Sequence, residues 1–276
     1  MLLLEVRTPY QPNTSVSATI AIPVRNGESF IAGAIESALG QTFKEFNVVV
    51  VDNASTDGTA CIVSNYPSVE YVRYSEVVSM PESFNRAVQH STGTYTRLLC
   101  ADDRLHPACL EQSVHALLDH PTAVMCASDE IQVDGDGCRQ AERPLAFHGL
   151  LGGERAKVRL LRRGNWIGGP SAVTVRTTAL QGALFDPRYQ CSFDLECWTR
   201  LLGAGDFIGV KGALYESTIH AGQATNRCMS GGFRNDWNLL RTQTARLSNS
   251  RRVSRYWVMR LRSGLERGFR RRESDC

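Results

Sequence analysis

The sequence predicts an α/β fold in which helices flank a mostly parallel central sheet. Between Ala18 and Glu130, short β-rich runs alternate with amphipathic segments, which is the pattern of consecutive βαβ units. The loops after these runs are polar, and open α/β sheets bind their ligands at that edge. With 276 residues, 42% of them hydrophobic and 21% charged, the chain can bury a substantial core.

Five strands and four helices are expected in this first half. The run Ser55-Thr56-Asp57 predicts a helix start, because short oxygen-bearing side chains cap free backbone N–H groups, and Gly40 predicts a helix end. The expected strands are residues 18–24, 46–51, 69–74, 94–99 and 123–128, and the expected helices are residues 28–39, 57–65, 81–90 and 107–118.

After Glu130 the alternation becomes irregular. Because no second regular βαβ series follows, we expect this part to complete the first sheet rather than to fold alone. Its expected elements are helices at 151–163 and 194–202, a turn at 165–171 and a strand at 172–176.

The predicted organisation is one main domain with an appended segment. The domain covers residues 1–225, with halves at 18–130 and 131–225, and residues 226–276 form a basic helical extension. We find no internal repeat and no low-complexity tract.

The composition also bears on the compartment. The chain contains no uninterrupted run of about 18 apolar residues, which a membrane-spanning helix would need, and the apolar stretch at Met1 is too short for a secretory signal. The nine cysteines are scattered and include no C-x-x-C pair. We therefore expect a cytoplasmic protein with free thiols, without structural zinc and without a disulfide framework.

Two adjacent carboxylates, Asp102 and Asp103, follow the hydrophobic run Leu98-Leu99. At the carboxyl end of a strand, such a pair offers the hard oxygen ligands that Mg²⁺ or Mn²⁺ takes beside substrate phosphates. An Asp-Asp pair before Pro107 is equally compatible with a simple helix cap. The residues alone leave both interpretations open.

A second acidic position, Asp52, ends the run Val49-Val50-Val51 and precedes a turn of small residues. It could accept a hydrogen bond from a ligand, beside the positive end of the next helix, or it could belong to an ordinary capped turn. The chain has neither G-x-G-x-x-G nor G-x-x-x-x-G-K-[ST], which argues against a dinucleotide dehydrogenase and a P-loop enzyme.

The order and spacing of these motifs resemble those of glycosyltransferase family 2, which has the Rossmann-like GT-A fold. Weaker similarity extends the match over most of residues 18–225, through Gly169-Pro170-Ser171, Asp194 with Trp198, and His220. The principal matching residues are Ile22-Pro23, Asn26-Gly27-Glu28, Ser37, Gln41-Thr42, Asp52 through Thr59, Asn85, Gly93, Tyr95 and Asp102-Asp103.

The resemblance implies a site for a nucleoside-diphosphate sugar in the first half of the domain. Asp52 would read the base, Asp102 would contact the ribose or the sugar diphosphate, and Asp103 would hold Mn²⁺ or Mg²⁺ against the diphosphate. The residues implied in nucleotide-sugar binding are Pro23, Asn26, Glu28, Asp52 and Asp102.

The resemblance also implies the catalytic group, in the acceptor half of the domain. Asp194 matches the general base, which would take the proton from an acceptor hydroxyl as its oxygen attacks the anomeric carbon, with inversion. A helix N-cap at Asp194 is compatible with that role. His220 matches a histidine that could approach the metal, although a solvent-facing loop histidine is the plainer interpretation. We expect Asp52, Asp103 and Asp194 to converge on one cleft.

Three positions depart from the family pattern. Arg25 replaces a common aromatic residue, Cys100 stands where many relatives carry another aspartate, and Phe193 precedes the base where many have an acid. These changes leave the donor base and sugar undefined. The chain also lacks the Q-x-x-R-W motif of processive synthases, which favours transfer of single sugars.

The expected function is an inverting, metal-dependent transfer of one sugar to a carbohydrate, lipid-linked or other hydroxyl acceptor, in cell-surface polysaccharide or glycolipid biosynthesis. A catalytically silent sugar-nucleotide-binding protein is one alternative. A nucleotidyltransferase is another, disfavoured because the Gly-rich basic loop that such enzymes use is absent.

The tail concentrates the positive charge. Residues 251–276 hold nine arginines and three acidic residues, and an apolar residue recurs every four positions from Val253 to Phe269. A basic amphipathic helix can lie on an anionic membrane surface, here the inner face, or its apolar row can dock on the catalytic domain. Nucleic acid is not expected as a partner, because no binding motif accompanies the charge.

Overall fold

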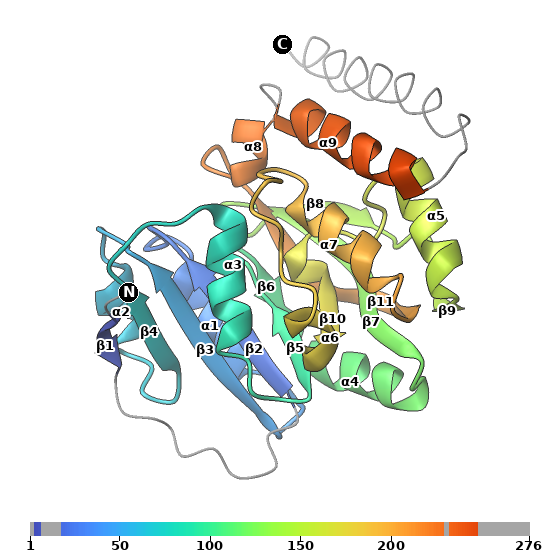
Figure 1. The fold of residues 1–276 in the computed structure, drawn as a ribbon. Helices are drawn as coiled ribbons and strands as arrows, with labels where there is room; N and C mark the ends of the chain where they lie inside the picture. Colours follow the sequence, from blue (N-terminus) through green and yellow to red (C-terminus); the bar gives the residue numbers. More distant parts are fainter. Residues whose placement is uncertain (1–2, 7–17, 229–231, 248–276) are drawn as a thin grey trace, which may run out of the picture.

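The computed structural model describes residues 3–6, 18–228 and 232–247, and these form one mixed sheet with helices on both of its faces (Figure 1). The strands are β1 Leu3–Val6, β2 Ala18–Val24, β3 Phe46–Asn53, β4 Glu70–Tyr74, β5 Tyr95–Leu98, β6 Arg104–Leu105, β7 Ala123–Asp134, β8 Arg139–Arg143, β9 Gly149–Leu151, β10 Val173–Arg176 and β11 Asp206–Ile219. The helices are α1 Ile31–Leu39, α2 Thr59–Val63, α3 Met80–Gln89, α4 Cys109–Asp119, α5 Gly153–Arg163, α6 Thr177–Gln181, α7 Phe193–Leu201, α8 Ala224–Cys228 and α9 Gly232–Leu247, with a 3₁₀ turn η1 at Pro170–Ala172.

The predicted α/β class with a mostly parallel centre is confirmed. The strands run in the order β1-β4-β3-β2-β5-β10-β7-β11-β6, and β4, β3, β2 and β5 are parallel to one another. All seven residues of β2 are buried, as expected for a parallel strand that helices cover on both faces. The carboxyl ends of these strands therefore meet at one edge.

The part of the chain after Glu130 completes this sheet, as predicted. Strand β10 lies antiparallel between β5 and β7, and β11 runs parallel to β7. The 14-residue β11 was not predicted from the sequence. Its pairing shifts between Val210 and Ala213, next to Gly212 with φ of 105°, and such a bulge interrupts the alternation that would reveal a strand.

The expectation that all cysteines are free is wrong. Cys191 and Cys228 form a disulfide, with their Cα atoms 5.6 Å apart across a sequence separation of 37 residues. The local spacing of the cysteines does not predict this pair, because only the tertiary fold brings the two residues within bonding distance. The free cysteines in the described part of the chain are Cys61, Cys100, Cys109, Cys126, Cys138 and Cys197.

Helix α8 begins at Ala224, just before the predicted start of the extension at residue 226, and α9 lies within the extension, whose bounds stay a prediction. The apolar row from Val253 to Phe269 lies outside the described residues, so its contact with a membrane or with the domain stays a prediction. Within the described residues, none of the helices combines the length and apolar composition that a membrane span requires.

Gly93, just before β5, carries a prediction for stability. A Cβ atom at this position would lie 2.5 Å from the carbonyl carbon of Ala18 and 2.6 Å from its Cα, and backbone atoms of a central strand cannot move aside easily. We expect Gly93→Ala to lower the free energy of unfolding by about 1–3 kcal/mol, measured by urea denaturation. Gly135→Ala is the control, because nothing lies within 4 Å of the added atom. Equal midpoints for the two variants would contradict the prediction.

Candidate functional site

A cleft of 930 Å³ opens at the edge where the parallel strands end. Its wall includes the loop after β2, the loop after β5, the ends of β7 and β11, and the start of α7. The sequence-predicted site residues that line it are Pro23, Asn26, Asp102, Asp103, Asp194 and His220. Glu28 and Asp52 are not part of its lining.

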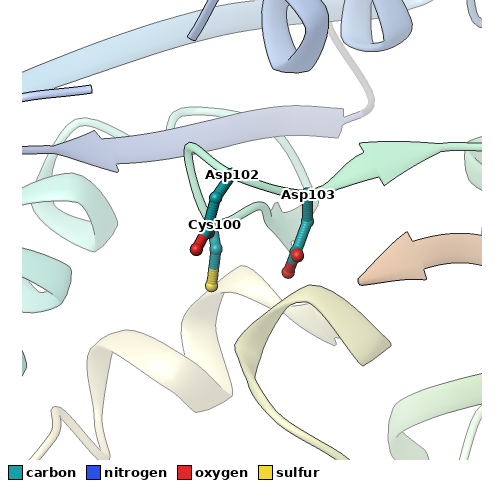
Figure 2. A group of neighbouring side chains, drawn as sticks. All are labelled: Cys100, Asp102 and Asp103. Atoms are coloured by element: carbon teal, nitrogen blue, oxygen red, sulfur yellow. The ribbon is translucent and has the colours of Figure 1, made fainter. Parts of the chain in front are cut away.

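Asp102 and Asp103 lie on the loop between β5 and β6, where Cys100 joins them (Figure 2). One ligand atom from each of the three residues lies within 4.8 Å of the others. Asp103 is 8% exposed, and one of its carboxylate oxygens accepts the backbone N–H of Thr218 at 3.0 Å. Burial, together with the neighbouring charge of Asp102, raises the pKa of Asp103 to about 7.

These residues fit a divalent cation. Carboxylate oxygens are the ligands that Mg²⁺ and Mn²⁺ prefer, and burial and the adjacent charge of Asp102, which raise the pKa of Asp103, are both effects that a bound cation would offset. Burial also raises the pKa of the Cys100 thiol well above its usual value. Cys100 is therefore a neutral group beside two carboxylates, rather than a third anion.

His220 lies next to this pair of carboxylates. Its Nε2 is 3.0 Å from Oδ2 of Asp102, and its ring lies 4.5 Å from that of Phe30. These contacts hold the imidazole at the cleft. The plainer interpretation of the sequence, a solvent-facing loop histidine, is therefore not what the structure shows. His220 is not in the group of potential ligand atoms formed by Cys100, Asp102 and Asp103, so its role as a metal ligand stays a prediction.

Asn26 and Glu28 connect the first two loops at this edge. The Asn26 side-chain oxygen accepts the backbone N–H of Thr56 at 2.9 Å, and the Glu28 carboxylate accepts that of Gly58 at 2.7 Å. Asn26 has a left-handed backbone with φ of 53°, which asparagine tolerates better than most residues. Glu28 is exposed but does not line the cleft, and its contact with a nucleotide stays a prediction.

Asp52 does not reach the cleft, although we expected it to converge there. Its side chain is completely buried, and its two carboxylate oxygens accept the backbone N–H of Ser55 at 2.8 Å and the hydroxyl of Tyr71 at 2.6 Å. Arg73 lies 3.8 Å from the same carboxylate. These contacts fit the capped-turn interpretation, and reading of the base by Asp52 remains a prediction.

Asp194 lies in the first turn of α7 and lines the cleft. Its Oδ2 accepts a hydrogen bond from the Asn165 side chain at 2.7 Å, and its Oδ1 accepts the backbone N–H of Leu195 at 2.7 Å. Burial is the main cause that raises the pKa of Asp194 to about 7, and the negative charge of Asp236 adds to it. A carboxyl with this pKa can accept a proton near neutral pH.

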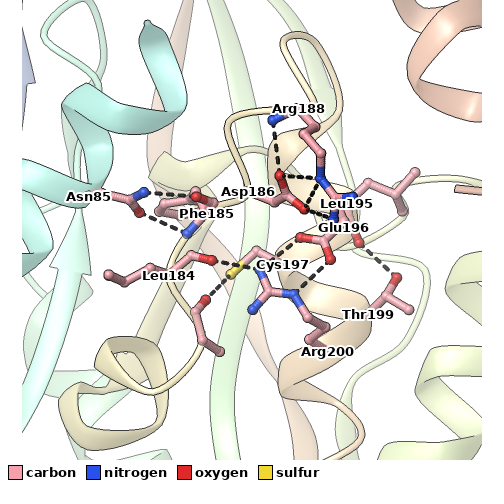
Figure 3. A network of polar contacts seen from close by, with 11 residues as sticks. Asn85, Leu184, Phe185, Asp186, Arg188, Leu195, Glu196, Cys197, Thr199 and Arg200 are labelled. Carbon is pink, nitrogen blue, oxygen red and sulfur yellow. Dashed lines mark hydrogen bonds and ion pairs between the residues drawn. The ribbon is translucent and has the colours of Figure 1, made fainter. Parts of the chain in front are cut away.

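A polar network holds α7 against the preceding loop (Figure 3). Glu196 and Arg200 form a two-point ion pair on the helix, and Arg200 donates to the carbonyl of Leu184 at 2.7 Å. Asn85 on α3, which belongs to the motif set, forms two hydrogen bonds with the backbone of Phe185, at 2.7 and 2.8 Å. Helix α7, which carries Asp194, is thus bonded to the preceding loop, and that loop is bonded in turn to α3.

Two residues that support the site, Asn165 and Arg97, were not predicted from the sequence. Asn165 meets Asp194 across 29 residues of sequence. Arg97, fully buried, donates to the carbonyls of Ser171 and Ala172, while the Ser171 hydroxyl accepts the backbone N–H of Cys100 at 2.9 Å. Arg97 thereby fixes the η1 turn against the loop that carries the two carboxylates. The sequence did contain one indication of this role, because Arg97 is a charged residue within the predicted core strand 94–99.

Comparison with known proteins gives a consistent result for fold and family. The crystal structure of S. aureus TarS residues 1–349 in complex with UDP-GlcNAc superposes with a TM-score of 0.63 and 20% sequence identity, over 76% of this chain and 60% of that one. The same fragment in complex with UDP gives a TM-score of 0.62. At this identity the likeness concerns the GT-A fold, and this chain spans about 60% of the solved structure.

Relatives in sequence carry glycosyltransferase names. An uncharacterized glycosyltransferase of Rickettsia prowazekii (strain Madrid E) is 25% identical over 77% of this chain and 67% of its own length. The putative teichuronic acid biosynthesis glycosyltransferase TuaG of Bacillus subtilis (strain 168) is 27% identical over 38% of this chain and 43% of its own. The model of glycosyl transferase family 2 matches residues 19–182, more than half of the chain. The chain therefore belongs to glycosyl transferase family 2, as its motifs predicted.

Proposed function

We propose that this protein transfers a single sugar from a nucleoside-diphosphate sugar to an acceptor hydroxyl, with inversion at the anomeric carbon and with Mn²⁺ or Mg²⁺ at the donor. One observation carries the proposal. A carboxylate pair suited to a cation, Asp102 and Asp103, and a carboxyl suited to proton transfer, Asp194, line the same cleft from different elements. Inverting transfer needs one group of each kind.

The donor side of the proposal rests on the loop after β5. Asp103 would hold the cation, Asp102 would contact the ribose or the diphosphate, and Pro23 and Asn26 would line the nucleotide pocket. The cation would neutralise charge that develops on the leaving diphosphate. The binding of UDP and UDP-GlcNAc by a protein of the same fold supports a nucleotide donor.

The chemical step would depend on Asp194. Its carboxylate takes the proton of the acceptor hydroxyl while that oxygen forms a bond to the anomeric carbon. The bond from this carbon to the diphosphate oxygen breaks at the same time, and its electron pair leaves with the nucleoside diphosphate. Attack from the face opposite the leaving group inverts the configuration, and no covalent enzyme intermediate forms.

The pKa of Asp194 predicts the pH dependence of transfer. Only the ionised carboxylate can accept a proton, so kcat should fall about tenfold per pH unit below pH 7 and level off above it, because this pKa is raised to about 7. The measurement is the initial rate at saturating Mn²⁺, donor and acceptor between pH 5 and 9. A rate that stays constant down to pH 5 would contradict this assignment.

The acceptor is proposed from the relatives and the tail. The name of TuaG refers to teichuronic acid biosynthesis, which supports a role in cell-surface polysaccharide or glycolipid synthesis. Although the Cys191–Cys228 disulfide removes the argument from free thiols, we further propose a cytoplasmic protein that reaches a carbohydrate or lipid-linked acceptor at the inner face of the membrane. The nine arginines of residues 251–276 are the feature that supports this location.

A panel of sugar nucleotides tests the function directly. The full chain is incubated with each donor, with Mn²⁺ or Mg²⁺ and with a mixture of carbohydrate acceptors, and the released nucleotide is identified. Release of nucleoside diphosphate in a metal-dependent way is the expected result. Formation of nucleoside triphosphate and sugar 1-phosphate when pyrophosphate is added to the donor would instead indicate a nucleotidyltransferase, and donor binding without any release would indicate a silent binding protein.

A further inference from the structure

The residues 190–192 connect the loop after α6 to the start of α7, two positions before Asp194, and they touch the C-terminal helix α9. The backbone N–H groups of Cys191 and Ser192 both donate to Oδ2 of Asp236, at 2.6 and 2.7 Å. That of Gln190 approaches Oδ1 of the same residue at 3.4 Å. One carboxylate of α9 thus receives three consecutive backbone donors.

A covalent bond joins the same two regions. Cys191, in the middle of the 190–192 segment, is bonded to Cys228 at the end of α8. Gly232, where α9 begins, lies so close that a Cβ atom there would be 2.4 Å from Sγ of Cys191. Cys191 and Cys228 both line the cleft together with Asp194. The start of the extension is therefore part of the cleft wall.

Because Asp236 is buried, its hydrogen bonds restrict the movement of residues 190–192. Asp236 is 5% exposed, and a buried carboxylate that loses its hydrogen-bond donors is left as a charge without partners, which strongly destabilises the structure. Hydrogen bonds to an ionised acceptor are also stronger than those between neutral groups. The 190–192 segment consequently cannot shift away from α9 without a large penalty, and Asp194 follows it directly along the chain.

We propose that Asp236 is a positioning residue, which fixes the direction of the Asp194 carboxyl in the cleft by holding the backbone of residues 190–192. This inference rests on the proposed function of Asp194. It assigns to the first part of the 226–276 extension a role in the reaction, separate from any role of the arginine-rich tail. The disulfide limits how far the segment can move, and the carboxylate sets its orientation.

The charge of Asp236 provides a readout that a purely structural role would not give. The carboxylate of Asp236 on α9 and the neutral thiol of Cys197 on α7 both interact electrostatically with Asp194, which also accepts a hydrogen bond from the uncharged side chain of Asn165. Removal of the Asp236 charge removes one cause of the raised pKa of Asp194. The acid limb of the pH profile should therefore move to lower pH in Asp236→Asn.

The test compares Asp236→Asn with Asn235→Ala, a neighbouring exposed position on α9. We expect Asp236→Asn to lower kcat by roughly 10- to 100-fold, the effect of a displaced catalytic group. Binding of UDP in the presence of Mn²⁺, measured by calorimetry, should stay within twofold, and Asp236→Glu should recover part of kcat. Asn235→Ala should match the unmodified protein in both kcat and UDP binding.

Hydrogen exchange separates this inference from the proposed function. The amides of residues 190–192 should exchange faster in Asp236→Asn than in Asn235→Ala, and this measurement needs no substrate. If the unmodified protein releases no nucleoside diphosphate from any donor, the proposed function fails while the exchange result still stands. The inference is overturned if kcat of Asp236→Asn equals that of Asn235→Ala, or if kcat and UDP binding fall together, since Asp236 would then support the whole fold.

Discussion

Replacement of Asp194 by asparagine should reduce the rate of sugar transfer by about 10²- to 10⁴-fold, the usual contribution of a positioned base. Asparagine keeps the size of the side chain and can still accept the hydrogen bond from Asn165, but it cannot take a proton. Affinity for UDP with Mn²⁺ should be unchanged, because Asp194 comes from α7 and not from the loop whose carboxylates, Asp102 and Asp103, are proposed to bind the donor and the cation. The initial transfer rate and calorimetric UDP binding check the two parts.

Asp136→Asn is the matched control for this variant. Asp136 is an exposed carboxylate in the turn between β7 and β8, so the same chemical change there should leave transfer intact. Unchanged turnover in Asp194→Asn would refute the proposed base. A parallel loss of UDP binding would show that Asp194 supports the donor site and not only the proton transfer.

Replacement of Asp103 by asparagine should abolish the effect of Mn²⁺ on donor binding. Loss of a residue that merely supports a metal ligand typically costs about 10- to 100-fold in metal affinity, and loss of the ligand itself should cost at least as much. An amide oxygen can still accept the backbone N–H of Thr218, so the loop should keep its shape. Calorimetric titration of UDP, with and without Mn²⁺, measures the difference.

Stability provides the control for Asp103→Asn. The pKa of Asp103 is raised to about 7 in the folded protein from 3.8, so its proton stabilises the folded state below pH 4, and this contribution is lost as the pH rises through 7. Without divalent cation at pH 8, the variant should therefore unfold at a temperature no lower than that of the unmodified protein. A lower unfolding temperature together with lost UDP binding would indicate a damaged loop instead of a lost metal ligand.

The strands of the first half could be predicted because their signals are local. The run 18–24 was placed at its exact bounds, and 46–51 differs from β3 by two residues at one end. The expected helix at 28–39 begins later, at Ile31, because Glu28 is engaged with the loop at Gly58. Strand β11 was missed, since its glycines and charged residues interrupt the alternation on which such predictions depend.

The site was predictable where motif and strand end coincide. Asp102 and Asp103 follow a buried strand, and the order of the parallel strands brings their loop to the cleft. Asp194 was identified by resemblance and does line that cleft. Asp52 lies at the carboxyl end of buried strand β3, yet its carboxylate accepts hydrogen bonds from Ser55 and Tyr71. A strand end thus predicts the correct edge, but not which side chains face a ligand.

By itself the sequence determined the α/β class, the family and the carboxylates of the β5 loop, because periodicity, turn residues and motif spacing are properties of short stretches of chain. The tertiary structure alone decided that Asp52 is buried, that Asn165 meets Asp194, and that Cys191 is bonded to Cys228 beside Asp236. Each of these contacts joins residues whose partners depend on how the whole sheet and its helices assemble. The free energy that selects them comes from the burial of the complete core, which no local pattern records.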